Sequence, residues 1–187
     1  MFKLTSKVKV LSILLLGFFY FSCEKESSAN LETEISGESG ITYNTSKDTW
    51  EELKNKMGDS YNYTTETKFW NGFEDKTIIQ VEEGEVVSRE YESRRVTYVN
   101  GEQNIEIIES YSESSSDLNS HENGAETLTI NELYDTCLSE YLVVDETENT
   151  IYFDTFNSGV ISICGYRDNS CADDCFRGFQ ITEFNWE

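Results

Sequence analysis

The chain of 187 residues contains no proline and a single histidine. The absence of proline argues against a rigid, extended stalk. Catalysis by a Ser-His or Cys-His pair depends on an imidazole held near its nucleophile. The one imidazole, His121, stands in a segment rich in Ser, Glu and Asn. The same count excludes zinc sites built from several histidines. Because neither kind of catalytic centre is indicated, we expect a protein that is not an enzyme.

Basic residues are also scarce. The chain has 14 Lys and Arg against 36 Asp and Glu, which gives a formal net charge of −22. Such a field repels nucleic acids and anionic lipid surfaces. Compatible partners are cations and basic proteins, and we expect no nucleic-acid partner.

No hydrophobic run is long enough to span a bilayer, which takes about 20 apolar residues. The apolar run at residues 10–21 follows three lysines and ends at Ser22-Cys23. A basic start followed by a short apolar run predicts a signal peptide over residues 1–22. A small residue directly before a cysteine resembles the lipobox of bacterial lipoproteins. The resemblance implies cleavage before Cys23 and acylation, of the palmitate type, on its thiol.

Acyl chains on Cys23 would hold the protein on a membrane, because each buried methylene contributes about 0.8 kcal/mol. The charged start at residues 24–28 resembles the surface-export tag of Bacteroidota lipoproteins. We therefore expect a lipid-anchored protein of the cell envelope, in the outer membrane and facing the periplasm or the cell surface. The alternative is an ordinary secretory signal with Cys23 as an early mature residue.

The remaining chain divides by composition. Residues 23–44 are rich in Ser, Glu and Gly without an apolar period, which predicts a flexible acidic tether. Residues 45–187 are of a size for a single domain. Within this domain, residues 112–124 are heavy in Ser, Glu and Asn and predict a solvated acidic loop.

Periodicity predicts two helices. The first covers residues 47–57, with Ser46 as N-cap and Gly58 as the stop. The second begins at a capping box formed by Thr129 and Glu132. Its apolar face contains Ile130, Leu133, Tyr134, Cys137, Leu138 and Tyr141. Cys137 is therefore expected to point to the core.

Alternating runs between turn residues predict the strands. Asn71-Gly72 and Asn100-Gly101 are hairpin signals, because Asn and Gly tolerate positive φ. The predicted strands are 61–70, 76–82, 85–91, 95–99, 104–111, 150–155, 160–166 and 179–184. Together these elements predict an α+β fold, an antiparallel sheet of about six to eight strands with two helices on one face. Because helix and hairpins follow each other twice, two similar helix-hairpin halves are a further hypothesis.

A set of short motifs carries a family resemblance. They are Trp50, Tyr61-x-Tyr63, Gly84-x-Val86-Val87, Thr129-Ile130-Asn131-Glu132-Leu133-Tyr134 and Ile151-x-Phe153-Asp154. In this order, across residues 50–184, the chain resembles a family of uncharacterised small bacterial lipoprotein domains. The resemblance implies a secreted α+β domain with no established activity. The acidic loop at 112–124 is an insertion relative to that pattern, and no functional residue is carried over.

Four cysteines follow Cys23, all in the last third of the chain: Cys137, Cys164, Cys171 and Cys175. An even set outside the cytoplasm predicts disulfides, and four cysteines allow three pairings. One hypothesis pairs Cys137 with Cys164 and Cys171 with Cys175. Each bridge typically adds about 2–4 kcal/mol to stability.

The segment around the last two cysteines is unusually rich in oxygen ligands. They are Asp168, Asn169, Asp173 and Asp174. A Cys171–Cys175 bridge would pinch them into a tight loop, and such a loop can hold calcium. It lacks the spacing and the closing Glu of an EF-hand, and the interpretation we favour is a disulfide-stapled solvent turn. Calcium is therefore the one possible cofactor; otherwise we expect none.

Two aromatic residues flank the first hairpin tip. Trp70 and Phe73 can stack on a sugar or a partner, or form a cross-strand pair that packs over the turn, which is the interpretation we favour. The leading functional hypothesis is an envelope-anchored lipoprotein with a non-catalytic binding or structural role and an envelope or surface protein as partner. The alternatives are a calcium-dependent binding module and a secreted enzyme inhibitor.

Overall fold

The computed structural model describes residues 35–172 and 175–187. The predicted signal peptide, Cys23 and the first part of the predicted tether lie outside the described residues. Within the described residues, no helix has the length and apolarity needed to cross a membrane.

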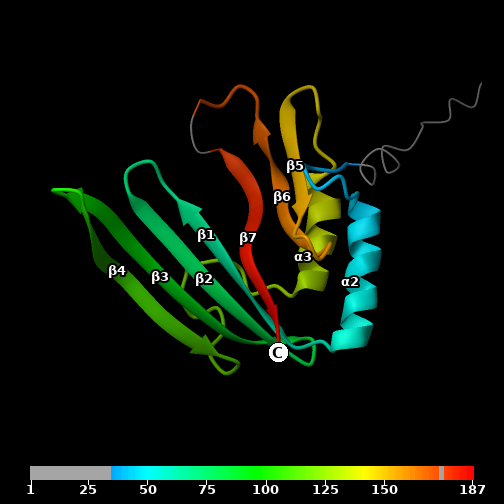
Figure 1. Ribbon diagram of the computed structural model, residues 1–187, viewed down its shortest axis with the longest axis horizontal. Coiled ribbons are helices and arrows are strands. Elements are labelled where there is room, and N and C mark those ends of the chain that lie inside the picture. The colour runs from blue at the N-terminus through cyan, green and yellow to red at the C-terminus, as the bar shows by residue number, and fades with distance from the viewer. Residues whose placement is uncertain (1–34, 173–174) are drawn as a thin grey trace, which may run out of the picture.

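The core element is one antiparallel sheet of seven strands, in the order β4-β3-β2-β1-β7-β6-β5 (Figure 1). The strands are β1 (Tyr61–Lys68), β2 (Phe73–Glu82), β3 (Glu85–Val99), β4 (Glu102–Ser114), β5 (Asn149–Thr155), β6 (Ile161–Asp168) and β7 (Phe176–Trp186). The predicted fold class, α+β with an antiparallel sheet, is confirmed, and the strand number falls in the predicted range. Figure 1 shows α2 (Tyr43–Met57) and α3 (Ile130–Thr136) beside the β7-β6-β5 end, away from β3 and β4.

The first helix, α2, begins about one turn earlier than predicted. Its N-cap is Thr42, whose hydroxyl accepts a hydrogen bond from the Thr45 N–H. The predicted cap, Ser46, is buried inside the helix. Its hydroxyl donates to the Gly159 carbonyl at 2.7 Å and lies 2.6 Å from the Tyr134 hydroxyl. The prediction was wrong because a buried serine can serve the core as well as a helix end.

Part of the predicted tether belongs to the domain. Residue Ser36 forms a β-bridge with Thr42, and Glu38 and Ser39 donate their N–H groups to the Asp154 carboxylate, each at 3.1 Å. Residues 35–42 are therefore held against β5 and lead directly into α2. Low apolar content in the sequence concealed these contacts, because they are made by the backbone.

The second helix starts as predicted. Thr129 accepts the Glu132 N–H, and the Glu132 carboxylate accepts the Thr129 N–H at 2.7 Å, which is the predicted capping box. After α3 the helix widens into a π-helical turn, η1 (Cys137–Tyr141), in which the Leu142 N–H bonds to the Cys137 carbonyl. Cys137 is buried in the core, as expected from the apolar stripe.

The core is built largely from aromatic rings. Trp50 of α2 meets Tyr61 edge-on at 5.3 Å and stacks on Trp186 at 5.3 Å. The buried hydroxyl of Tyr61 accepts the Ile130 N–H at the start of α3. Burial raises the pKa of Tyr134 to about 12. These tyrosines can be buried because each hydroxyl has a partner.

Two disulfides are present, with the pairing of our hypothesis. Cys137 of η1 pairs with Cys164 of β6, and both are fully buried. Cys171 pairs with Cys175 in the connection from β6 to β7. The first bridge fastens the helical segment to the sheet, and the second closes only a short turn.

Strands β3 and β4 form a hairpin longer than predicted. The sequence suggested two separate strands at 85–91 and 95–99, whereas β3 runs without a break from Glu85 to Val99. Asn100 and Gly101 both have positive φ at the tip, as their turn type requires. Strand β4 continues to Ser114, so the first residues of the predicted acidic loop are part of the sheet.

The two disulfides differ in expected stabilisation. Replacing Cys137 and Cys164 by Ala should lower the free energy of unfolding by about 3–4 kcal/mol, because that bridge closes a long loop in the unfolded chain. Replacing Cys171 and Cys175 by Ala is the matched control and should cost about 2 kcal/mol or less. Urea unfolding of both variants measures the difference. A larger loss for the second pair would contradict the role assigned to Cys137–Cys164.

Candidate functional site

The sheet opens between strands β1 and β7, near its centre. β1 pairs with β7 from Tyr61 opposite Trp186 up to Thr65 opposite Ile181, and a bulge at Thr64/Thr65 shifts the register. Beyond this point β1 pairs only with β2, and residues 176–180 of β7 pair only on the side of β6. Two strand edges therefore face each other without a ladder between them. We call the space between them the β1–β7 cleft.

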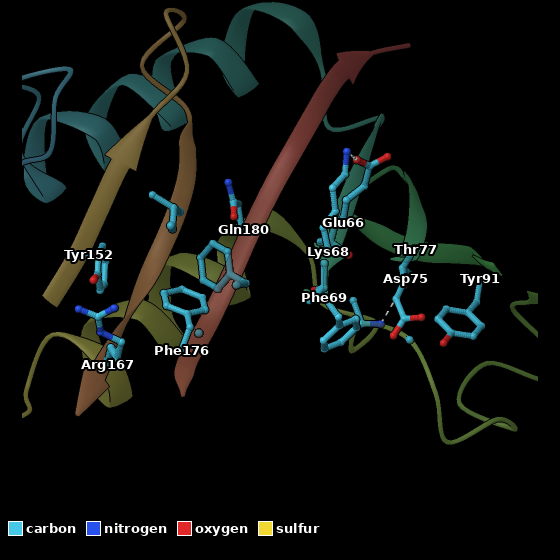
Figure 2. Close-up of a pocket in the computed structure, with 17 residues that line it drawn as sticks. Glu66, Lys68, Phe69, Asp75, Thr77, Tyr91, Tyr152, Arg167, Phe176 and Gln180 are labelled. Atoms are coloured by element: carbon cyan, nitrogen blue, oxygen red, sulfur yellow. Dashed lines mark hydrogen bonds and ion pairs between the residues drawn. The ribbon is translucent and has the colours of Figure 1, made fainter. Parts of the chain in front are cut away.

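The β1–β7 cleft has a volume of about 640 Å³, within the range of ligand sites. Figure 2 shows Phe69 and Asp75 on one side of it and Phe176 and Arg167 on the other. One wall comes from β1, β2 and β3, and the other from β5, β6 and β7. The cleft thus passes between the two halves of the sheet.

Glycines shape the wall formed by β6 and β7. Gly165 and Gly178 are cross-strand partners, and a Cβ on either would collide with the opposite backbone. The ring of Phe176 covers Gly165 and meets Tyr152 edge-on at 5.8 Å. Because no side chain fills the position of Gly165, the Phe176 ring lies close against the strand, and it lines the cleft.

Charged groups of both signs line the rim. Lys68 lies 4.0 Å from Glu66 on β1, and its side chain remains mostly exposed. Arg167 stands on the opposite wall, and Asp75 lies on β2 beside the Tyr91 ring (Figure 2). The cleft can therefore offer aromatic rings to apolar groups, and separate charges to a cation and to an anion.

The connection from β4 to α3 closes the helix-facing side of the cleft. Gly124 and Ala125 of this connection lie against β2, and the Ala125 N–H donates to Thr77 Oγ1 at 3.0 Å. The Gly124 backbone also approaches Tyr91 and Tyr111, where a Cβ would not fit. The position of this loop therefore sets one boundary of the cleft.

A buried ion pair holds that loop. Arg89 donates Nε and Nη2 to the two carboxylate oxygens of Glu113, both at 2.9 Å, and both side chains are almost fully buried. Arg89 also donates to the carbonyls of His121 and Ala125. The Arg89 guanidinium, with the N–H groups of Asn119 and His121, holds the pKa of the Glu113 carboxyl far below its usual range.

The loop at 112–124 is thus more than a solvated segment. His121 stacks on the Tyr111 ring at 4.0 Å and places Nδ1 3.0 Å from Glu113. Ser120 Oγ also faces Nδ1, at 3.2 Å. A nucleophile of a Ser-His-acid triad faces the imidazole nitrogen opposite the carboxylate. Here Ser120 and Glu113 both face Nδ1, so the three side chains do not have the arrangement of such a triad.

The candidate calcium ligands are only partly described. Asp168 Oδ1 accepts from the N–H and the hydroxyl of Ser170, which lowers the pKa of Asp168, and Asn169 Oδ1 accepts from Thr150. Asp173 and Asp174 lie outside the described residues. Among the residues that are described, no group of three or more His, Cys, Asp or Glu side chains could hold a metal ion. Calcium at this loop stays a prediction.

The two hairpin aromatics are separated in the structure. Trp70 is 85% exposed, and no ring contact joins it to Phe73. Phe73 instead receives the Arg95 guanidinium over its ring at 4.8 Å. The favoured interpretation, a cross-strand pair over the turn, is therefore wrong. The turn is closed by the Phe69 N–H bonding to the Phe73 carbonyl, which leaves Trp70 at the tip.

Comparison of the chain with protein-family models, with curated proteins and with solved structures gives no match in any of the three. The functional argument therefore rests on the geometry of the site.

Glu113→Gln tests the buried ion pair and the loop it holds. The substitution leaves the Arg89 charge buried without its partner, and we expect the free energy of unfolding to fall by about 3–5 kcal/mol. Glu106→Gln, an exposed change on the same strand, should alter it by about 0.5 kcal/mol or less. Urea unfolding at neutral pH measures both.

The pH dependence gives a second measurement. Because the folded pKa of Glu113 lies below the unfolded one, its contribution is complete above the unfolded value of about 4.3 and is lost as pH falls through and below it. The unfolding free energy of Glu113→Gln should therefore fall less steeply than that of the native chain in this acid range. Equal slopes would contradict the role of the ion pair.

Proposed function

We propose that this protein is an envelope-anchored, non-catalytic binding protein, and that the β1–β7 cleft receives an extended segment of a partner polypeptide. The observation that carries the proposal is the pair of strand edges, residues 66–68 of β1 and 176–180 of β7, that face the cleft with no strand opposite them. An extended peptide can satisfy such edges with its own backbone, as in strand addition to a sheet.

The lining of the cleft suits a polypeptide better than a compact polar ligand. Phe69 and Phe176 line the cleft and offer rings to apolar side chains of a bound strand. Lys68 and Arg167 offer partners to carboxylates, and Glu66 offers one to a basic side chain. Backbone pairing supplies affinity in this binding mode, and such side-chain sites supply selectivity.

A non-catalytic role is supported by how the reactive groups are used. His121 Nδ1 faces Glu113 and Ser120 together, so Ser120 is poorly placed to pass a proton through the other nitrogen. The carboxylates of the cleft, Glu66 and Asp75, extend from neighbouring strands along its rim. Both are partly buried, and Glu66 lies beside Lys68.

Anchoring is the second part of the proposal, and it rests on the signal-like start and Ser22-Cys23. The described domain begins at residue 35, and residues 23–34 would span at most about 40 Å if fully extended. A domain held by a segment of this length can contact the bilayer surface and a partner protein at the same membrane. The family resemblance to small bacterial lipoprotein domains supports the same placement.

We also propose that both helices cover one face of the sheet in two related helix-hairpin halves. In support, Trp50 of α2 and the start of α3 both contact Tyr61 of β1. Each helix is followed along the chain by an antiparallel run of strands, β1 to β4 after α2 and β5 to β7 after η1.

A photo-cross-linker tests the cleft. With Phe176 replaced by p-benzoylphenylalanine in the full chain, irradiation of envelopes should give a covalent adduct with a partner polypeptide, identified by mass spectrometry. The same residue at Glu183, exposed on β7 where that strand pairs with β1, is the matched control and should give none. Gln180→Trp, which fills the cleft, should abolish the Phe176 adduct. Adducts of equal yield at both positions, or an adduct with a glycan alone, would contradict the proposal.

Anchoring has its own test. Cys23→Ser should release the chain from the membrane fraction and remove metabolic palmitate labelling, because no other group would carry the acyl chains. A Cys171→Ser/Cys175→Ser variant should keep both the label and the fractionation. If Cys23→Ser stays in the membrane fraction with its label, the lipoprotein proposal fails.

A further inference from the structure

Most exposed large hydrophobic side chains gather at the end of the sheet that the helices leave bare. On β3, β4 and the neighbouring hairpin tip these are Trp70, Tyr98, Val99, Ile105, Ile107 and Ile108. Figure 1 shows this hairpin extending from the sheet at the end opposite α2 and α3. Exposed apolar patches of this kind mark interaction sites.

Strand β4 is the last strand at its side of the sheet, and its outer edge is free of a strand partner among the described residues. Because side chains alternate along a strand, those of β4 point in turn to the two faces of the sheet. Ile105 and Ile107 pair with Val96 and Arg94 on one face. Glu102 and Glu106 pair with Val99 and Arg95 on the other. Arg95 is directed at Phe73, and it forms no ion pair with Glu106.

Only half of this edge strand is covered. A bulge at Ile108 separates residues 109–114 from the outer residues 102–107. The loop after β4 folds back over the inner half, where Asn123 Nδ2 donates to Glu109 at 2.8 Å. Residues 102–107 have neither a covering loop nor the lysines and prolines with which natural edge strands avoid pairing.

The charge of the edge selects its partner. Residues 96–166 contain no lysine or arginine, and the outer carboxylates of Glu102 and Glu106 form no hydrogen bond or ion pair with any described residue. Opposite charges across a ladder are favourable, and like charges are unfavourable. A second copy of this chain, pairing β4 against β4, would bring glutamates toward glutamates. A strand with basic side chains at alternate positions would meet carboxylates on one face and isoleucines on the other.

We propose that the outer edge of β4, residues 102–107, is a second binding surface that adds an extended segment of a partner protein in which basic and apolar side chains alternate. The segment pairs its backbone with β4, sets its basic side chains beside Glu102 and Glu106, and covers Ile105 and Ile107. In the half of the sheet formed by β1 to β4, β4 is the outer strand and β1 borders the cleft. The proposed site is therefore separate from the β1–β7 cleft and does not depend on it.

A short peptide tests the inference with the full chain in detergent. The probe is a fluorescent peptide of about six residues, alternating lysine and valine, which matches the length of the free edge. Fluorescence anisotropy should detect binding, and Glu106→Lys should weaken it by about tenfold or more, because it turns an attractive pair into a repulsive one. Glu90→Lys makes the same charge change at an exposed site on β3, inside the sheet, and should alter affinity by less than about twofold.

Methylating the peptide nitrogens that face β4 removes the backbone pairing, and it should also weaken binding by about tenfold or more. The inference is overturned if the native chain does not bind the probe, if the methylated peptide binds equally well, or if Glu90→Lys weakens binding as much as Glu106→Lys. Loss of binding in Gln180→Trp would place the peptide in the cleft and would also overturn it. Sedimentation showing dimers of the native chain that dissociate in Ile105→Asp, which adds a carboxylate to this edge, would assign the edge to a second copy instead.

Discussion

The short ladder between β1 and β7 joins the two halves of this protein. Tyr61 and Trp186 face each other at its start, and Trp50 of α2 packs on both rings, so one helix clamps the seam of the sheet. Aromatic contacts of this kind contribute beyond the area they bury. The aromatic contacts hold the β1–β7 ladder at the end where Tyr61 faces Trp186. At its other end the ladder stops at a bulge, and there the two strands separate. The cleft is therefore a consequence of how the two halves are joined, because the same strands that pair below the bulge form its walls above it.

Much of the architecture was predictable because it is encoded locally. The capping box at Thr129 and the Asn100-Gly101 turn each fix a short segment through their own backbone bonds, and both are present as predicted. The apolar stripe correctly turned Cys137 inward, and its pairing with Cys164 agrees with the one hypothesis stated among the three possible pairings. Ser46 shows where such reasoning fails, since its hydroxyl serves a partner far away in the sequence, and local rules assigned it to a helix end.

The site itself could not be predicted, because it arises from distant segments. Phe176 and Gly165 come together only when β6 and β7 pair, and Lys68 reaches the same cleft from the other half of the sheet. The glycine in the middle of a strand pattern was the one local signal that could have indicated a close approach. The acidic loop is exposed at most positions, as its polar composition suggests. Composition could not indicate that Glu113 is the buried partner of Arg89, a residue on another strand.

The long stretch without lysine or arginine, residues 96–166, has a consequence for turnover. It forms the end of β3 and all of β4, the loop after it, α3, η1, β5 and most of β6, and the Cys137–Cys164 bridge lies within it. Proteases that cleave after a basic residue find no bond to cut there, even if the segment unfolds. Nor does it offer a primary amine for acylation or ubiquitin-like attachment. Because residues 96–166 lack lysine and arginine, proteases that cleave after basic residues cannot cut this segment, whether it is folded or unfolded.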